Sequence, residues 1–179
     1  MRLLGRVRLL VTVFALWPTS AARAELPPPL LLGGPGGDAA AILARHNQHR
    51  PRHCAPELAW SEEAARAAQA WAERLAHECT FKHSSSKYGE NLWMGTAGAF
   101  GPEQVVDSWY SESKGYDYAR PGFSMRTGHF TQLVWRATRR LGCGTATCKG
   151  NQIWVCNYEP PGNVEGQFRE NVLPTTCKG

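Results

Sequence analysis

The chain has 179 residues, a formal net charge of +5 and six cysteines. The positive excess lies at the N-terminus: residues 1–24 contain four arginines and no acid, and the remainder holds sixteen basic and fifteen acidic side chains. A near-neutral remainder excludes a protein that binds nucleic acid or an anionic membrane mainly through its charge. The roughly 150 residues that follow are enough for one domain with a hydrophobic core.

The first 24 residues are organised like a secretory signal peptide. A basic stretch precedes the apolar run LLVTVFALW, and the small residues Ala22 and Ala24 suit a cleavage site. The apolar run is shorter than the roughly 18 residues that a transmembrane helix needs, and no other segment reaches that length. We therefore expect a soluble protein that is secreted to the extracellular space.

All six cysteines follow the predicted signal peptide. An even number of cysteines in an exported chain predicts three disulfides, although the sequence alone does not choose the pairing. A structural zinc site is less favoured because the spacings lack paired CxxC motifs. The cysteines are Cys54, Cys79, Cys143, Cys148, Cys156 and Cys177.

The segment 25–37 is rich in proline and glycine and is predicted to be an irregular leader, with the folded domain spanning 38–179. Asp38 is predicted to cap the first helix. One face of this helix carries three residues at helical spacing: Ile42, Leu43 and His46.

A second helix is predicted from Ser61, as the N-cap, to a point near Cys79. Glu62 and Glu63 fall in its first turn, where carboxylates interact favourably with the helix dipole. Its apolar face follows the helical period with Ala64, Ala67, Ala68, Trp71 and Leu75.

A third helix is predicted to begin at Pro102, with Val105, Val106 and Trp109 on one stripe. Glu112 falls on this same apolar stripe. A carboxylate on the buried face of a helix costs several kcal/mol unless it is paired or hydrogen-bonded. Such departures from packing rules often mark functional positions.

The last third of the chain contains three short segments rich in β-branched and aromatic residues, which we interpret as antiparallel strands. These are FTQLVW (130–135), LGCGTATC (141–148) and QIWVCNY (152–158). EPPGN then predicts a turn. Helices followed by strands predict an α+β domain in which helices pack on a sheet.

Four titratable residues stand out as a candidate site. His83 and Glu90 flank the polar tract HSSSKYGEN, Glu112 interrupts an apolar stripe, and His129 lies at the mouth of the first predicted strand. Two imidazoles and two carboxylates suit a divalent metal such as zinc, or proton exchange between an acid and a base. Alternatively, each histidine only donates a hydrogen bond to a glutamate and ties loops together.

The remaining histidines are not predicted to belong to a site: His46 packs within the first helix, and His49, His53 and His77 are solvated. No residue is assigned a catalytic role. A free thiol is not expected, and the motifs GxSxG and HExxH are absent.

Five motifs together resemble the CAP superfamily of cysteine-rich secretory, antigen 5 and pathogenesis-related 1 (PR-1) proteins. They occur in the family's order over residues from about 38 to 173, and they look closest to secreted PR-1-like and Golgi-associated PR-1-like members. The motifs are HNQHR, HSSSKYGENL, WYSESKGYDY, GHFTQLVW and CNYEPPGNVEGQF. The resemblance implies a three-layer α-β-α sandwich with an antiparallel sheet, disulfides and a central cleft.

In such proteins the cleft holds two histidines and two glutamates, which fall here on His83, Glu90, Glu112 and His129. The family pattern also implies that Cys79 pairs with Cys148 and Cys143 with Cys156. Cys54 and Cys177 are then left to join the two ends of the domain.

The resemblance implies a secreted, non-enzymatic protein that binds a small apolar ligand such as a sterol or a fatty acid. In some members the cleft histidines bind zinc, so His83 and His129 are the expected metal ligands here. One alternative is a defence-related (antimicrobial) protein, or one with an extracellular protein or membrane partner. Another is a hydrolase that uses the four cleft residues on a metal-bound water. No nucleic-acid partner is expected.

Overall fold

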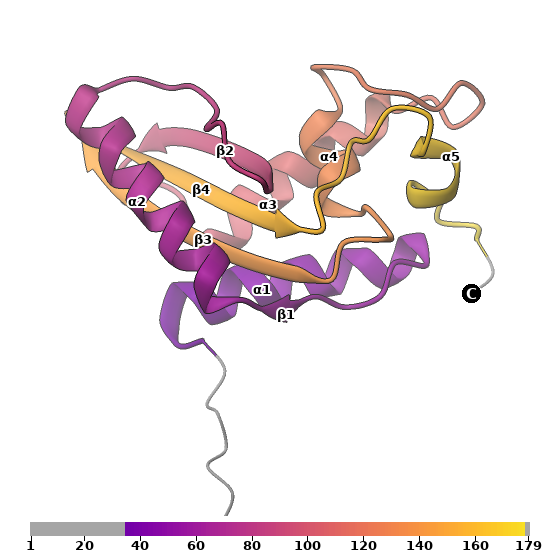
Figure 1. The fold of residues 1–179 in the computed structure, drawn as a ribbon, viewed down its shortest axis with the longest axis horizontal. Coiled ribbons are helices and arrows are strands. Elements are labelled where there is room, and N and C mark those ends of the chain that lie inside the picture. Colours follow the sequence, from indigo (N-terminus) through magenta and orange to yellow (C-terminus); the bar gives the residue numbers. More distant parts are fainter. Residues whose placement is uncertain (1–34, 178–179) are drawn as a thin grey trace, which may run out of the picture. The chain divides into compact units, whose positions relative to one another are not determined.

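A computed structural model of the chain describes residues 35–177 (Figure 1). The predicted signal peptide 1–24 and most of the predicted leader 25–37 lie outside the described residues. The α-helices are α1 (Gly37–His49), α2 (Glu62–Glu78), α3 (Pro102–Ser111), α4 (Gly128–Leu133) and α5 (Phe168–Asn171), and the 3-10 helices are η1 (Arg50–His53) and η2 (Glu112–Gly115). The strands are β1 (Ala59–Trp60), β2 (Gly89–Thr96), β3 (Arg140–Cys148) and β4 (Asn151–Glu159).

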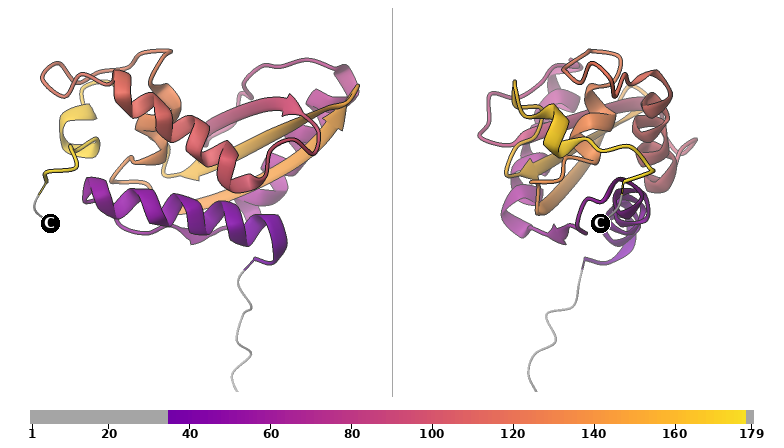
Figure 2. Two further views of the ribbon diagram at one scale, coloured as in Figure 1. Left: turned by 180° about the vertical axis from the view of Figure 1, so that it is seen from behind. Right: turned by 90° about the vertical axis from the view of Figure 1, so that its right-hand side faces the viewer.

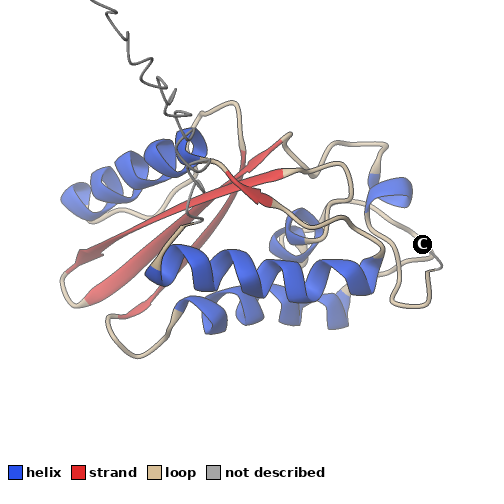
Figure 3. Cartoon of the chain, turned by 90° about the horizontal axis from the view of Figure 1, so that it is seen from below, coloured by secondary structure: helices blue, strands red, loops and turns tan. Residues whose placement is uncertain are grey.

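The fold is a three-layer α-β-α sandwich around a four-stranded sheet of order β1-β3-β4-β2. Helix α2 covers one face of the sheet, while α1, α3 and α4 pack together against the other (Figures 1 and 2). The view along the edge of the sheet shows helices on both sides of it (Figure 3). No helix between residues 35 and 177 is both long enough and apolar enough to cross a membrane.

The sheet is mixed. Strand β4 pairs antiparallel with β2 and with β3, whereas the short β1 runs parallel to β3. Both predicted strands at 141–148 and 152–158 are confirmed within β3 and β4. Strand β2 was not predicted, because its glycines and Asn91 are poor strand formers and its pairing with β4 is a tertiary effect.

The predicted strand at 130–135 is wrong, because most of this segment forms α4 and His129 therefore lies in a helix. A short buried apolar run does not distinguish helix from strand by its periodicity. Four of the six residues that were read as a strand are large, apolar and buried: Phe130, Leu133, Val134 and Trp135.

The other helix predictions differ in detail. Helix α2 has Ser61 as its N-cap, whose side chain accepts a hydrogen bond from Ala64 N, and α3 begins at Pro102, both as predicted. The predicted cap at Asp38 is wrong: Gly36 is the N-cap of α1, and Asp38 lies in its first turn. Helix α1 therefore begins at Gly37, inside the predicted leader.

The core contains histidines that the sequence did not place there. His49 and His53 were predicted to be solvated, yet both are buried, as is His46, whereas His77 is exposed as predicted. The ring of His49 stacks on that of Tyr110 with centroids 3.8 Å apart. Both nitrogens of His46 and of His53 have hydrogen-bond partners, which compensates for removing them from water. His49 Nε2 bonds to Asp107, whereas its Nδ1 is buried without a partner among the described residues.

Three disulfides are formed, in the pairs that the family resemblance implies. Cys79–Cys148 joins the end of α2 to the end of β3, and Cys143–Cys156 joins β3 to β4. Cys54–Cys177 links the segment after η1 to the C-terminal segment, over a sequence separation of 123 residues.

Candidate functional site

A cleft of about 150 Å³ lies where β2, α4 and the loops beside them meet. Three of the four predicted site residues line it, and the fourth, Glu112, is hydrogen-bonded directly to His129 behind the cleft wall. The lining residues are His83, Glu90, Asn91, Phe123, Met125, Gly128, His129 and Asn163.

His83 and Glu90 form one half of the site. His83 comes from the loop after α2 and Glu90 from the start of β2, and His83 Nδ1 donates to Glu90 Oε1 at 2.7 Å. The same oxygen accepts from the backbone N of Ser84 at 3.0 Å, so the loop is fixed to the strand at two points. This hydrogen bond with Glu90 raises the pKa of His83 above its ordinary value, although partial burial opposes the shift.

Glu112 and His129 form the other half. Glu112 ends α3, and its Oε1 accepts from His129 Nδ1 at 2.7 Å. Its Oε2 accepts from the backbone N of His129 at 3.0 Å and from that of Phe130 at 3.1 Å. The carboxylate on an apolar stripe is thus paired with three donors in the first turn of α4, which compensates for its partial burial.

The two histidines share one arrangement. In each, Nδ1 is bound to a carboxylate, and within residues 35–177 neither Nε2 has a hydrogen-bond partner. A carboxylate on Nδ1 fixes the tautomer in which Nε2 carries a free lone pair, the form that binds metal ions. Both imidazoles line the same cleft.

The buried carboxylate of Glu90 supports this reading. Its side chain is only 6% exposed, and its Oε2 is buried without a hydrogen-bond partner in the described structure. A buried, unpaired carboxylate oxygen beside a cleft fits a cationic ligand. Among residues 35–177, however, no three His, Cys, Asp or Glu side chains surround a common metal position. The candidate metal ligands are therefore the two imidazoles, and Glu90 Oε2 belongs to the same cleft.

The rim of the cleft is apolar, which sequence analysis did not foresee. Phe123 and Met125, in the loop before α4, are 52% and 80% exposed and line the cleft. Asn91 and Asn163 were also missed. The position of Asn91 directly after Glu90 could have indicated that it lies near the cleft. Nothing in the sequence of the loop before α4 predicts that this loop folds over the cleft.

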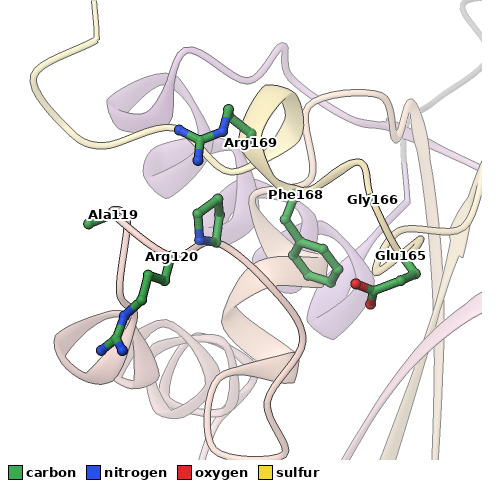
Figure 4. A pocket seen from close by; sticks show the side chains of 7 residues that line it. Ala119, Arg120, Glu165, Gly166, Phe168 and Arg169 are labelled. Carbon is green, nitrogen blue, oxygen red and sulfur yellow. The ribbon is translucent and has the colours of Figure 1, made fainter.

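A second pocket, of about 380 Å³, lies between the loop before α4 and helix α5 (Figure 4). It contains no histidine, and its floor is formed by the ring of Phe168. Arg120 Nε already donates to Asp117 Oδ2 at 2.9 Å, and Figure 4 shows its guanidinium far from that of Arg169. This pocket therefore lacks the converging groups that the cleft has.

Comparison with known proteins identifies the family. The model of the cysteine-rich secretory protein family (CAP) matches residues 43–158. This chain belongs to the CAP family. The match covers both histidines and both glutamates of the cleft, so the resemblance that the motifs indicated is confirmed.

Relatives of known sequence include proteins of quite different length. The CAP domain is 42% identical to the human Golgi-associated plant pathogenesis-related protein 1 over 140 residues, which cover 74% of this chain and 90% of the relative. It is 40% identical to Protein PRY2 of Saccharomyces cerevisiae over 136 residues, which cover 74% of this chain but only 40% of the relative.

Solved structures agree on the fold. The venom allergen-like protein 4 of Schistosoma mansoni superposes with a TM-score of 0.63 at 23% identity, over 79% of this chain and 99% of that chain. NaASP2, solved with Zn²⁺, superposes with a TM-score of 0.56 at 24% identity, over 82% and 91%. These similarities establish the three-layer fold of the CAP domain.

Proposed function

We propose that the cleft binds a divalent metal ion such as zinc through Nε2 of His83 and Nε2 of His129. The observation that carries this proposal is the matched use of Nδ1: each imidazole is held by a carboxylate and leaves Nε2 free at the same cleft. Glu90 Oε2, buried and unpaired, supplies negative charge beside them. The solved structure of the relative NaASP2 with Zn²⁺ supports the choice of metal.

Zinc titration by calorimetry tests this proposal. The wild-type domain is expected to bind one zinc ion, and the double variant His83→Ala/His129→Ala is expected to lose this binding. His77→Ala is the matched control, because His77 is an exposed histidine that does not line the cleft. Equal zinc binding by the double variant and the wild type would refute the assignment.

We propose further that the ligand of the cleft has an apolar body and a polar head, as a sterol or a fatty acid has. The support comes from Phe123 and Met125, two exposed apolar side chains beside the polar interior. A volume of about 150 Å³ is below the several hundred Å³ of typical pockets for small molecules. Only the head of such a ligand enters, and its body lies along the apolar rim.

Binding of a radiolabelled sterol and a radiolabelled fatty acid tests the second proposal. The double variant Phe123→Ser/Met125→Ser is expected to weaken binding of the ligand at least several-fold. Met94→Ser is the control, because Met94 is 47% exposed but does not line the cleft. Lipid binding that is equally strong in all three proteins would place the lipid elsewhere.

The proposed setting of this activity is the extracellular space. Three disulfides within the described residues suit an oxidising compartment, and the N-terminal segment has the pattern of a secretory signal. One relative is named as Golgi-associated, so retention inside the cell is the alternative to be tested. Tagged protein expressed in cultured cells is expected in the medium. Retention inside the cells would contradict secretion.

A further inference from the structure

A chain of buried, hydrogen-bonded side chains runs from helix α1 to the cleft along the face of the sheet that α1, α3 and α4 cover. His46 Nδ1 lies 2.7 Å from the carbonyl oxygen of Ile42, and His46 Nε2 lies 2.8 Å from the Tyr158 hydroxyl. Asn91 Nδ2 lies 3.1 Å from that hydroxyl and 3.1 Å from the carbonyl oxygen of His129. The three linking side chains are at most 1% exposed.

The direction of every hydrogen bond in this chain is fixed. The Ile42 carbonyl only accepts, so His46 carries its proton on Nδ1, and its Nε2 must accept. The Tyr158 hydroxyl therefore donates to His46. Its oxygen accepts from one N–H of Asn91, and the second N–H of Asn91 donates to the His129 carbonyl. His46 stays neutral near neutral pH, because burial lowers its pKa to about 3.

The chain ends at a backbone atom of a proposed metal ligand. Asn91 directly follows Glu90 in β2, and these two neighbours act on opposite halves of the cleft. Glu90 accepts from the imidazole of His83, while Asn91 donates to the backbone of His129. Two adjacent residues of β2 thus contact both halves of the cleft, one through the imidazole of His83 and the other through the backbone of His129.

We propose that His46, Tyr158 and Asn91 are positioning residues that hold His129 at the separation from His83 which metal binding requires. This inference rests on the proposed function of the cleft. The bonded atoms of these three side chains have no other hydrogen-bond partner between residues 35 and 177. Each hydrogen bond also polarises the next, so a buried network with one direction of donation is rigid. Removing a group that hydrogen-bonds to a metal ligand and orients it typically lowers metal affinity by about 10- to 100-fold.

The substitution Tyr158→Phe tests the inference because it removes one hydroxyl and keeps the ring. It leaves His46 Nε2 without a donor and one N–H of Asn91 without an acceptor. Tyr110→Phe is the matched control. The Tyr110 hydroxyl lies 3.0 Å from Nε2 of His53, whose Nδ1 donates to the carbonyl of Leu173. The control thus also deprives a buried histidine of a tyrosine hydroxyl and keeps the ring that packs on Phe130, but among the described residues no hydrogen bond links this pair to the cleft.

We expect zinc affinity to fall about tenfold or more in Tyr158→Phe and to change less than about twofold in Tyr110→Phe. Asn91→Ala is a second variant for the event that Tyr158→Phe does not fold. It breaks the link to His129 but leaves the bond between Tyr158 and His46, and the same loss of affinity is expected. Affinity that is unchanged, or reduced no more than in the control, would overturn the inference.

A readout that needs no metal separates this inference from the proposed function. The imidazole chemical shifts of His129 and His83 are compared by NMR in the metal-free wild type, Tyr158→Phe and Tyr110→Phe. A change at His129 alone, seen only in Tyr158→Phe, supports the positioning role even if the wild type binds no zinc. Unchanged His129 signals in Tyr158→Phe would overturn it, whatever the zinc result.

Discussion

Glu112 holds His129 at two points: its Oε1 accepts from the imidazole Nδ1 at 2.7 Å, and its Oε2 accepts from the backbone N at 3.0 Å. The ring and the backbone of His129 are therefore both fixed by the carboxylate of Glu112, which lies 17 residues earlier in the chain. His83 is held differently, on a loop, with a side chain that is 58% exposed. The cleft thus combines one rigidly placed imidazole with one that is more accessible.

Glu112→Gln is expected to weaken zinc binding by about tenfold or more, because the amide is a poorer acceptor than the carboxylate and cannot offer an acceptor on both sides. Calorimetry gives the affinity. The same change is expected to lower the free energy of unfolding by about 1–3 kcal/mol, since the donors of α4 lose a charged acceptor. Urea denaturation measures this cost.

Glu103→Gln is the control for this substitution, because Glu103 is exposed in the first turn of the same helix and lies outside the cleft. It is expected to leave zinc affinity unchanged. A Glu112→Gln protein that binds zinc as tightly as this control would show that the carboxylate does not orient His129.

Stability is expected to fall on acidification below about pH 6.5, the ordinary pKa of histidine. Burial lowers the pKa values of His46, His49 and His53, so the folded protein keeps these rings neutral where the unfolded chain takes up protons. Their contribution is complete above pH 6.5 and is lost as pH falls toward the lowered values. The slope is at most about 1.4 kcal/mol per pH unit for each ring.

Urea denaturation between pH 8 and pH 5 measures this dependence. His83 acts in the opposite sense, because its raised pKa gives stability below pH 6.5 that is lost as pH rises, so it offsets part of the slope. His77→Gln, at an exposed position, is expected to keep the wild-type slope. A free energy of unfolding that does not change from pH 7 to pH 5 would contradict the burial of the three rings.

Removal of the Cys54–Cys177 disulfide is expected to be costly. It closes the longest loop of the three, 123 residues, for which chain entropy gives about 4–5 kcal/mol. Cys54→Ser/Cys177→Ser is therefore expected to lower the free energy of unfolding by about this amount in urea denaturation. A loss below about 1 kcal/mol would mean that the C-terminal segment is held mainly by other contacts, such as the bond from His53 to the Leu173 carbonyl.

Much of the fold follows from local signals. Helix α2 has a capping serine, acidic first-turn residues and an alanine-rich face, and each signal points to the same element. The prediction of a strand at 130–135, where α4 forms, was wrong because a short apolar run suits a helix and a strand equally well. Tertiary packing decides between the two. Strand β2 has weak strand propensity and exists because β4 pairs with it.

The candidate site likewise has residues that the sequence predicted and residues that it did not. Glu112 was found from a break in helical periodicity, and His83, Glu90 and His129 were singled out from their local sequence. That the four share one cleft was implied only by the family resemblance. His49 and His53 were assigned to solvent because a helix face alone does not reveal that α3 covers it. The role of Asn91 was invisible, since its partners Tyr158 and His129 lie 67 and 38 residues away in the chain.

The measurement that tests the central claim most directly is a crystal structure of the zinc-soaked protein, with anomalous diffraction recorded at the zinc edge. We predict one anomalous peak in the cleft, about 2.0–2.1 Å from Nε2 of both His83 and His129. Two results would contradict the claim: zinc peaks elsewhere on the protein with none in the cleft, or a peak in the cleft that contacts neither Nε2 atom.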